Sequence, residues 1–146
     1  MNLQELTLVA NDYLSNQKNK IDTQMQLTID SVSATTCSVT IKNVGGKTIF
    51  LQNDDGYSWN TIILSYGDHD QWNSYTIETY TISEVKVTAT NATLNPATHK
   101  YITPGEQVTI TVDVPSGAPA IVSENIVSVT FASHYGVTAS GEVTMG

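Results

Sequence analysis

Apolar and polar residues alternate through most of this chain, which is the period of strands that bury one face. From Met25 onward apolar residues recur at every second position, first in runs that contain Leu27, Val39 and Ile49. Similar runs predict further strands over 61–66, 75–82, 84–90, 107–114, 126–132 and 137–143. Because no helical period interrupts these runs, we expect two packed antiparallel sheets, an all-β, immunoglobulin-like β-sandwich of about seven to nine strands.

Residues that favour turns separate the runs. Gly45 and Gly46 predict a tight hairpin, because both residues can adopt positive φ. Asp54-Asp55-Gly56 predicts the next turn. Further turns are expected at Asn95-Pro96, Pro104-Gly105, 115–119 and Tyr135-Gly136.

The first 24 residues have a different period. Their apolar positions, which include Leu3, Leu6 and Val9, are three or four residues apart, as on one face of a helix. This stretch becomes polar toward Lys20, so we interpret 1–24 as a short N-terminal helix, the lower part of a truncated pilin-like helix whose more apolar half this sequence lacks. An ordinary amphipathic helix packed on the sandwich is an equal alternative. The sandwich is expected over 25–144, and residues 145–146 are interpreted as vector residues.

Composition narrows the possible functions. A chain of 146 residues is the size of one domain, and only 14% of them are charged, with a net charge of −8. All six basic residues are lysines, which argues against nucleic-acid binding. The one cysteine, Cys37, lies in an alternating run and is expected in the core, so no disulfide framework or cysteine zinc site can form within the chain. Sparse charge also predicts tolerance of mildly acidic pH.

No group of residues has the spacing of a catalytic or metal site. The densest polar cluster, Asp68-His69-Asp70, does not match a calcium loop, and an EF-hand starting at Asp54 would need a glutamate where Ser65 stands. His69, His99 and His134 fall in separate predicted loops and are expected to be solvated. There is neither a G-x-S-x-G elbow nor a glycine-rich phosphate loop, so we expect no catalytic residues, no cofactor and no metal.

Aromatic residues gather between Tyr57 and Tyr80. We expect Trp59 and Tyr66 in the core. Trp72 and Tyr75 are predicted to be exposed, where they could stack on a sugar or anchor a protein interface.

The run Ser83–Thr88 alternates and is bounded by predicted loops, so it could be an edge strand that extends a sheet into a partner. Val85 and Val87 are therefore candidates either for the core, which is favoured, or for a homodimer contact. Asn91-Ala92-Thr93 is the only acceptor triplet for N-glycosylation, and Asn91 falls in a predicted loop.

Three segments resemble proteins of the archaellum, the archaeal flagellum. Residues 37–49 (CSVTIKNVGGKTI) are similar to the strand–turn–strand of archaellins and of the archaellum accessory proteins of the FlaF and FlaG families. Residues 101–112 (YITPGEQVTITV) resemble their penultimate strand, and residues 127–141 (VSVTFASHYGVTASG) resemble their closing hairpin. The resemblance covers most of the chain and implies an archaellin-like sandwich.

The same resemblance implies a non-enzymatic structural role in archaeal motility. FlaF-like and FlaG-like proteins are stator components, so the expected partners are the S-layer protein, another archaellum accessory protein (FlaF or FlaG), and a second copy of the chain. The implied location is the pseudoperiplasm between cell membrane and S-layer, with membrane attachment through the missing part of the N-terminal helix. A filament subunit of the archaellin or pilin type and a carbohydrate-binding module using Trp72 and Tyr75 remain as alternatives, and a hydrolase is the weakest one.

Overall fold

The computed structural model describes residues 24–52, 58–68, 70–77 and 79–146 of the chain. All regular secondary structure in these ranges is β-structure, in eleven antiparallel strands. The strands are β1 (Met25–Val32), β2 (Thr36–Asn43), β3 (Ile49–Phe50), β4 (Thr61–Gly67), β5 (Trp72–Ile77), β6 (Thr81–Val87), β7 (Thr93–Leu94), β8 (Tyr101–Ile102), β9 (Glu106–Asp113), β10 (Ile126–Ala132) and β11 (Thr138–Thr144).

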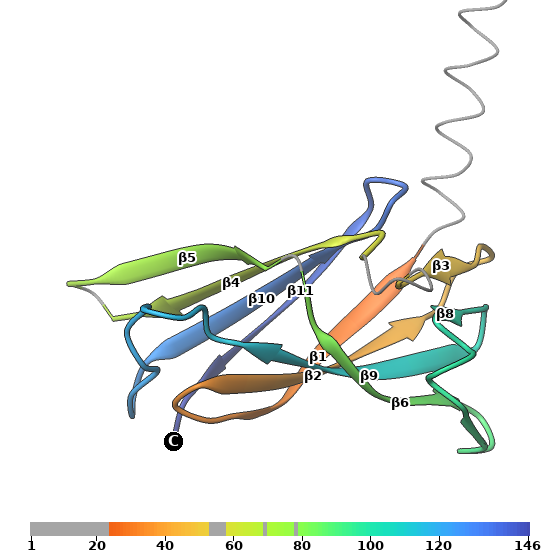
Figure 1. The fold of residues 1–146 in the computed structure, drawn as a ribbon, viewed down its shortest axis with the longest axis horizontal. Helices are drawn as coiled ribbons and strands as arrows, with labels where there is room; N and C mark the ends of the chain where they lie inside the picture. The colour runs from red at the N-terminus through yellow and green to blue at the C-terminus, as the bar shows by residue number, and fades with distance from the viewer. Residues whose placement is uncertain (1–23, 53–57, 69, 78) are drawn as a thin grey trace, which may run out of the picture.

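Two sheets form the sandwich that the alternating pattern predicts (Figure 1). One sheet has the strand order β1-β2-β9-β6-β7, and the other has the order β11-β10-β4-β5. A third, two-stranded sheet joins β3 to β8 at one end of the molecule (Figure 1). The all-β sandwich is therefore confirmed.

The core lies between the two main sheets and consists of every second residue of each long strand. On β2 these are Cys37, Val39 and Ile41, all fully buried, and the intervening residues point outward. The other fully buried strand residues are Ile49, Ile62, Leu64, Val85, Ile102, Val108, Ile110, Val112, Val127, Val129 and Phe131. Cys37 is thus a core residue, as predicted, and burial together with the nearby Asp30 carboxylate raises its pKa to about 11.

The two ends of the sandwich are made by different loops. We call one end the base: β2 ends there at Asn43, β9 begins there at Glu106 and β10 ends there at Ala132. The β3–β8 sheet and the turn between β10 and β11 belong to the base (Figure 1). We call the opposite end the tip. It contains the β1–β2 and β4–β5 turns and the segment 114–125.

Some sequence predictions of the strands were wrong. The hairpin predicted at Gly45-Gly46 does not form, because β2 pairs with β1 and β9 whereas β3 pairs with β8. Neither glycine has positive φ. The strands predicted over 75–82 and 84–90 are β5 and β6, which begin and end three residues or more earlier. The two-residue strands β7 and β8 are too short to leave an alternating pattern, which explains why the number of strands was underestimated.

Three predictions fall on residues outside the described ranges. They are the helix over 1–24 apart from its last residue, the turn at Asp54-Asp55-Gly56, and the solvation of His69. Within the described ranges, no helix has the length and apolar character needed to cross a membrane.

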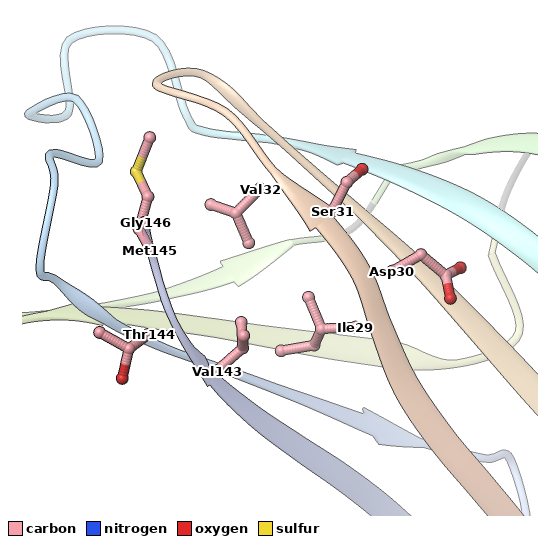
Figure 2. Close-up of a pocket in the computed structure, with 8 residues that line it drawn as sticks. All are labelled: Ile29, Asp30, Ser31, Val32, Val143, Thr144, Met145 and Gly146. Atoms are coloured by element: carbon pink, nitrogen blue, oxygen red, sulfur yellow. The ribbon is translucent and has the colours of Figure 1, made fainter.

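The edge strands β1 and β11 meet along one side of the sandwich. At Gly141 they approach so closely that a Cβ atom would lie 2.9 Å from Leu27 Cδ2 and 3.3 Å from the Leu27 carbonyl oxygen. Toward the tip the two strands separate around a pocket of about 120 Å³. Figure 2 shows Ile29 and Val32 pointing into this pocket, while Asp30 and Ser31, at a bulge in β1, point away from it. β1 and β11 are therefore in close contact only on the base side of this pocket.

Candidate interaction surface

Val85 lies in the core and not on a surface. Its side chain is fully buried, and its backbone is flanked on both sides, by Val108 of β9 and Leu94 of β7. Val87, near the end of the same strand, is half-buried. Of the two roles left open by the sequence, the core role therefore fits the Val85 side chain, and a partner on β6 would have to use its exposed residues Thr81 and Ser83.

Trp72 and Tyr75 do not form one surface. They are three residues apart on β5, so their side chains point to opposite faces of the sheet. Trp72 is 51% exposed, as predicted. Tyr75, predicted to be exposed, is instead half-buried against the core and lies 5.9 Å from Tyr66, ring centre to ring centre. Tyr66 is buried as predicted, but Trp59, also predicted in the core, is 54% exposed.

Asn91 lies at the surface, in the turn between β6 and β7. Its backbone has φ +57°, a left-handed conformation that asparagine tolerates better than most residues. The turn is held by backbone hydrogen bonds from Asn91 N to Val87 O and from Val87 N to Ala92 O, both 2.9 Å. Asn91 and Thr93 are both exposed, so the acceptor triplet is accessible.

Five aromatic rings form a continuous row across the base, which we call the aromatic row: His99, Tyr101, Phe50, His134 and Tyr135. Successive ring centres are 4.0, 6.3, 5.4 and 4.0 Å apart in that order. The rings are tilted against each other rather than stacked flat, which is a favourable arrangement for aromatic pairs. Phe50, at the centre, is 44% exposed.

The small β3–β8 sheet places the centre of the row. Ile49 pairs with Ile102 and Phe50 pairs with Tyr101, and because neighbours alternate in a strand, the two isoleucines are buried while Phe50 faces outward. Asn43 at the end of β2 fixes this sheet to the sandwich. Its side-chain amide donates to Lys47 O (2.7 Å) and Ile102 O (2.9 Å), and its Oδ1 accepts from Gly45 N (3.1 Å).

A second buried network holds the segment after β3. The Tyr80 hydroxyl donates to Asn60 Oδ1 (2.7 Å), and the Asn60 amide donates to Phe50 O (2.8 Å). Gln52 Nε2 donates to Tyr80 O at 2.8 Å. Burial raises the pKa of Tyr80 to about 12, so its hydroxyl remains a donor throughout the ordinary pH range. Phe50 is thus positioned from both sides by buried polar side chains.

His99 at one end of the row contacts a buried carboxylate. Its Nε2 lies 3.1 Å from Glu106 Oε1, and this oxygen also accepts hydrogen bonds from the backbone N–H and the hydroxyl of Thr103. Burial alone would raise the pKa of Glu106, but these hydrogen bonds and the His99 ring outweigh it and lower the pKa. The prediction that His99 is solvated was wrong, because only 19% of its side chain is exposed.

These contacts predict how stability depends on pH. Glu106 has a lower pKa in the folded than in the unfolded chain, so its contribution is complete above the unfolded value and is lost as pH falls below about 4.5. Burial lowers the pKa of His134, so the unfolded chain takes up this proton at a higher pH than the folded chain does. Some stability is therefore already lost as pH falls below about 6.5, before Glu106 begins to titrate. We expect cooperative melting at pH 5 and a steeper loss of stability below pH 4.5.

Thermal unfolding measured from pH 7 to pH 3 checks this expectation. Glu106→Gln should flatten the change below about pH 4.5, and His134→Gln should flatten the change between about pH 6.5 and 5. Loss of cooperative melting in the wild-type chain already near pH 5 would contradict the expected acid tolerance.

The sequence did not reveal the aromatic row, because its members come from three separate segments and none lies in a long strand. The only local signals are the pairs His99–Tyr101 and His134–Tyr135, each beside a predicted turn. As for metal sites, no group of three or more possible ligands from histidine, cysteine, aspartate and glutamate occurs within the described ranges.

Comparisons with known proteins agree with this fold. No protein-family model matches the sequence, and neither does any curated protein. Among solved structures, the chain is similar to the archaellum periplasmic stator protein FlaG from Sulfolobus acidocaldarius, with 20% identity, a TM-score of 0.52, and coverage of 83% of this chain and 99% of that chain. It is also similar to a chain of the archaeal flagellum of Methanospirillum hungatei strain JF1, with 13% identity, a TM-score of 0.64, and coverage of 97% and 76%. The resemblance to archaellum proteins that the sequence motifs indicated is therefore confirmed at the level of the fold.

Proposed function

We propose that this chain is a non-enzymatic structural component of an archaellum that braces or anchors the motor in the cell envelope. The observation that carries the proposal is the shared fold with the stator protein FlaG, which extends over nearly all of that protein. The proposed location is extracytoplasmic, between the cell membrane and the S-layer. The proposed partners are the S-layer protein and a sister accessory protein of the FlaF or FlaG type.

Features of the described residues support a static role. The core between the sheets is continuous, and buried polar side chains such as Asn43 and Asn60 are hydrogen-bonded. A closely packed sandwich whose buried asparagine side chains are hydrogen-bonded resists deformation, which an anchor requires.

Binding to isolated S-layer protein tests the proposal. The full chain would be measured by biolayer interferometry at acidic and neutral pH, with archaellin as a parallel ligand. Saturable binding to the S-layer protein alone is expected for an anchor. No binding to the S-layer protein, FlaF, FlaG or archaellin would overturn the proposed role.

A filament subunit is the second candidate, because the structural similarity to the flagellum of Methanospirillum hungatei has the higher TM-score, 0.64. The two roles differ in their deletion phenotypes. Deleting the gene of a filament subunit would remove the filament, whereas deleting an anchor would leave filaments that do not rotate.

The carbohydrate-binding alternative has less support from the geometry. Trp72 and Tyr75 lie on opposite faces of β5, so they cannot stack together on one sugar chain. Binding on a glycan array that disappears in Trp72→Ala would nevertheless restore this alternative.

We also propose that Asn91 carries a glycan when the chain is exported in an organism with N-glycosylation. The exposed turn gives an oligosaccharyltransferase access to the Asn91 amide. Intact-mass measurement of the chain from its native host should show a glycan mass that Asn91→Gln removes. An unmodified Asn91 in that host would contradict the proposal.

A further inference from the structure

A small polar pocket opens at the tip of the sandwich, between the β4–β5 turn and the segment 114–125. Its volume is about 200 Å³, which is below the roughly 300–1,000 Å³ of pockets that hold drug-sized ligands. The pocket therefore has room for one small ring. Its polar lining residues are Tyr66, Asp68, Gln71, Asn73 and Asn125, and apolar side chains of the segment 119–122 complete the lining.

Hydrogen bonds hold both walls of the pocket in place. The Tyr66 hydroxyl donates to Pro119 O, which ties the segment to β4. In the β4–β5 turn, Asp68 Oδ1 accepts from Gln71 N (2.9 Å), and Asp68 N donates to Gln71 O (2.8 Å). Gly67 permits this closure, because a Cβ atom there would lie 1.9 Å from Gln71 O. The pocket is therefore preformed, which lowers the entropy cost of binding a ligand.

Asn125 has a buried donor without a partner. The residue is 8% exposed, and its Oδ1 accepts from Val122 N (3.0 Å), which identifies the other side-chain atom as the amide nitrogen Nδ2. Among the described residues, Nδ2 has no hydrogen-bond partner. A buried polar group left in this way is rare in folded proteins. Because Asn125 lines the pocket, a molecule bound there can accept the missing hydrogen bond.

Two further amide side chains line the pocket. Asn73 on β5 is half-buried and pairs in register with Tyr66, and Gln71 is exposed at the rim. Neither side chain has a hydrogen-bond partner in the part of the chain that the structure describes. Each amide can donate and accept, and the Asp68 carboxylate accepts only. The lining therefore mixes donors and acceptors within a small volume.

This lining excludes several classes of ligand. An ammonium group or a metal ion offers the Asn125 donor nothing to bond to. An anion would be repelled by Asp68 in the lining and by Asp70 and Glu124, which are near the lining residues in the chain. An apolar group would leave the buried donor unpaired, which is unfavourable. His69 of the same turn lies outside the described residues, and above about pH 7 an ordinary histidine is neutral and leaves this charge balance unchanged.

We propose that this pocket binds one neutral sugar ring, whose hydroxyl groups accept from Asn125 Nδ2 and donate to the Asp68 carboxylate. A hydroxyl group both donates and accepts, so neighbouring hydroxyl groups match a lining of amides and a carboxylate. The apolar wall, which includes the exposed Val122, suits the C–H face of such a ring. The site does not involve the Trp72 ring, which points to the opposite face of β5 from Asn73. This inference does not depend on the archaellum role.

Nuclear magnetic resonance titration of the isotope-labelled full chain tests the site, at about pH 7.5, where an unperturbed histidine is neutral. The probes are glucose, galactose, mannose and N-acetylglucosamine. A single ring makes few hydrogen bonds, so we expect dissociation constants of about 1 mM or weaker. At least one sugar should shift the side-chain amide signals of Gln71, Asn73 and Asn125 to saturation. No shift with any sugar at about 50 mM, or shifts with acetamide or butylammonium but with no sugar, would overturn the proposal.

Asn125→Asp removes the donor but keeps an oxygen for Val122 N, so the chain should stay folded while sugar binding weakens about tenfold or more. Asn95→Asp is the matched control and should bind as the wild type does, because Asn95 accepts from Ala97 N (3.0 Å) in an exposed turn outside the pocket. Gln71→Ala changes only an exposed side chain. It should weaken binding about threefold or more without changing thermal unfolding. Sugar binding that is unchanged in both pocket variants would contradict the proposed site.

The sugar ring has two possible sources, a free monosaccharide and the end of a glycan on a partner, and a glycan array distinguishes them. Array binding that the free sugar inhibits would support the site and identify a glycan as its ligand. Binding of the free sugar without binding to any immobilised glycan would support the site and identify a monosaccharide. Array binding that neither the free sugar nor Asn125→Asp reduces would place sugar recognition elsewhere on the chain and refute the proposal.

Discussion

Replacing Val85 by lysine should abolish folding of this chain or cost more than about 4 kcal/mol of stability. The Val85 side chain is fully buried between β9 and β7, and the buried Glu106 carboxylate at the start of β9 is already engaged by Thr103 and His99. A lysine there must bury an unpaired charge or lose its proton, and both are costly. Circular dichroism and urea unfolding of the purified variant measure this effect.

Thr81→Lys is the matched control for this substitution, because Thr81 lies on the same strand and is exposed. It should change stability by less than about 0.5 kcal/mol. If Val85→Lys stayed folded at wild-type stability while losing self-association, Val85 would be an interface residue and its burial in the core would be wrong.

Asn43→Ala should cost about 3–5 kcal/mol and loosen the β3–β8 sheet before the rest of the sandwich unfolds. The substitution leaves the buried carbonyl group of Ile102 and the partly buried carbonyl group of Lys47 without their shared donor, at about 1–3 kcal/mol for each unpaired group. Hydrogen exchange should show the amides of Ile49 and Ile102 losing protection more than those of β10.

Asn95→Ala is the control for a lost asparagine hydrogen bond at the surface. The Asn95 side chain accepts from Ala97 N (3.0 Å) in an exposed turn, so its removal should cost less than about 1 kcal/mol. Equal effects of the two substitutions would contradict the role assigned to Asn43. Asn43→Asp should not rescue the fold, because a carboxylate cannot donate to the two carbonyl groups.

Strands with strict alternation and clear turns were predictable from the sequence. The strand over Ile126–Ala132 has the predicted bounds, since its buried valines and Phe131 alternate with outward polar residues and Gly136 follows in the next turn. The boundaries between residues 72 and 90 were not predictable. Trp72, at the start of β5, is an exposed aromatic residue that does not fit the alternating pattern of a strand. In β6, a bulge between Ile82 and Glu84 shifts the period of the alternation.

The candidate surface could not be predicted from the sequence for a different reason. Trp59 looked like a core residue because large aromatic residues are usually buried on average, yet it follows the segment 53–57 at the edge of the β3–β8 sheet. His99 looked like a solvated loop residue, and His134 is exposed as predicted. Their contacts with Glu106 and Phe50 depend on which loops share the base, and that is a property of the sheet topology rather than of local sequence.

The strands β1 and β11 run side by side in the same direction, from the base at Met25 and Thr138 to the tip at Val32 and Thr144. The first and last strands therefore present their outer ends at opposite poles of the domain. A pulling force applied between these poles runs along the strands and perpendicular to the ladder hydrogen bonds, so many bonds carry the load at once instead of opening one by one. We therefore expect the domain to resist tension best along its long axis. A force between an attachment at the base and a partner bound at the tip would act in this direction.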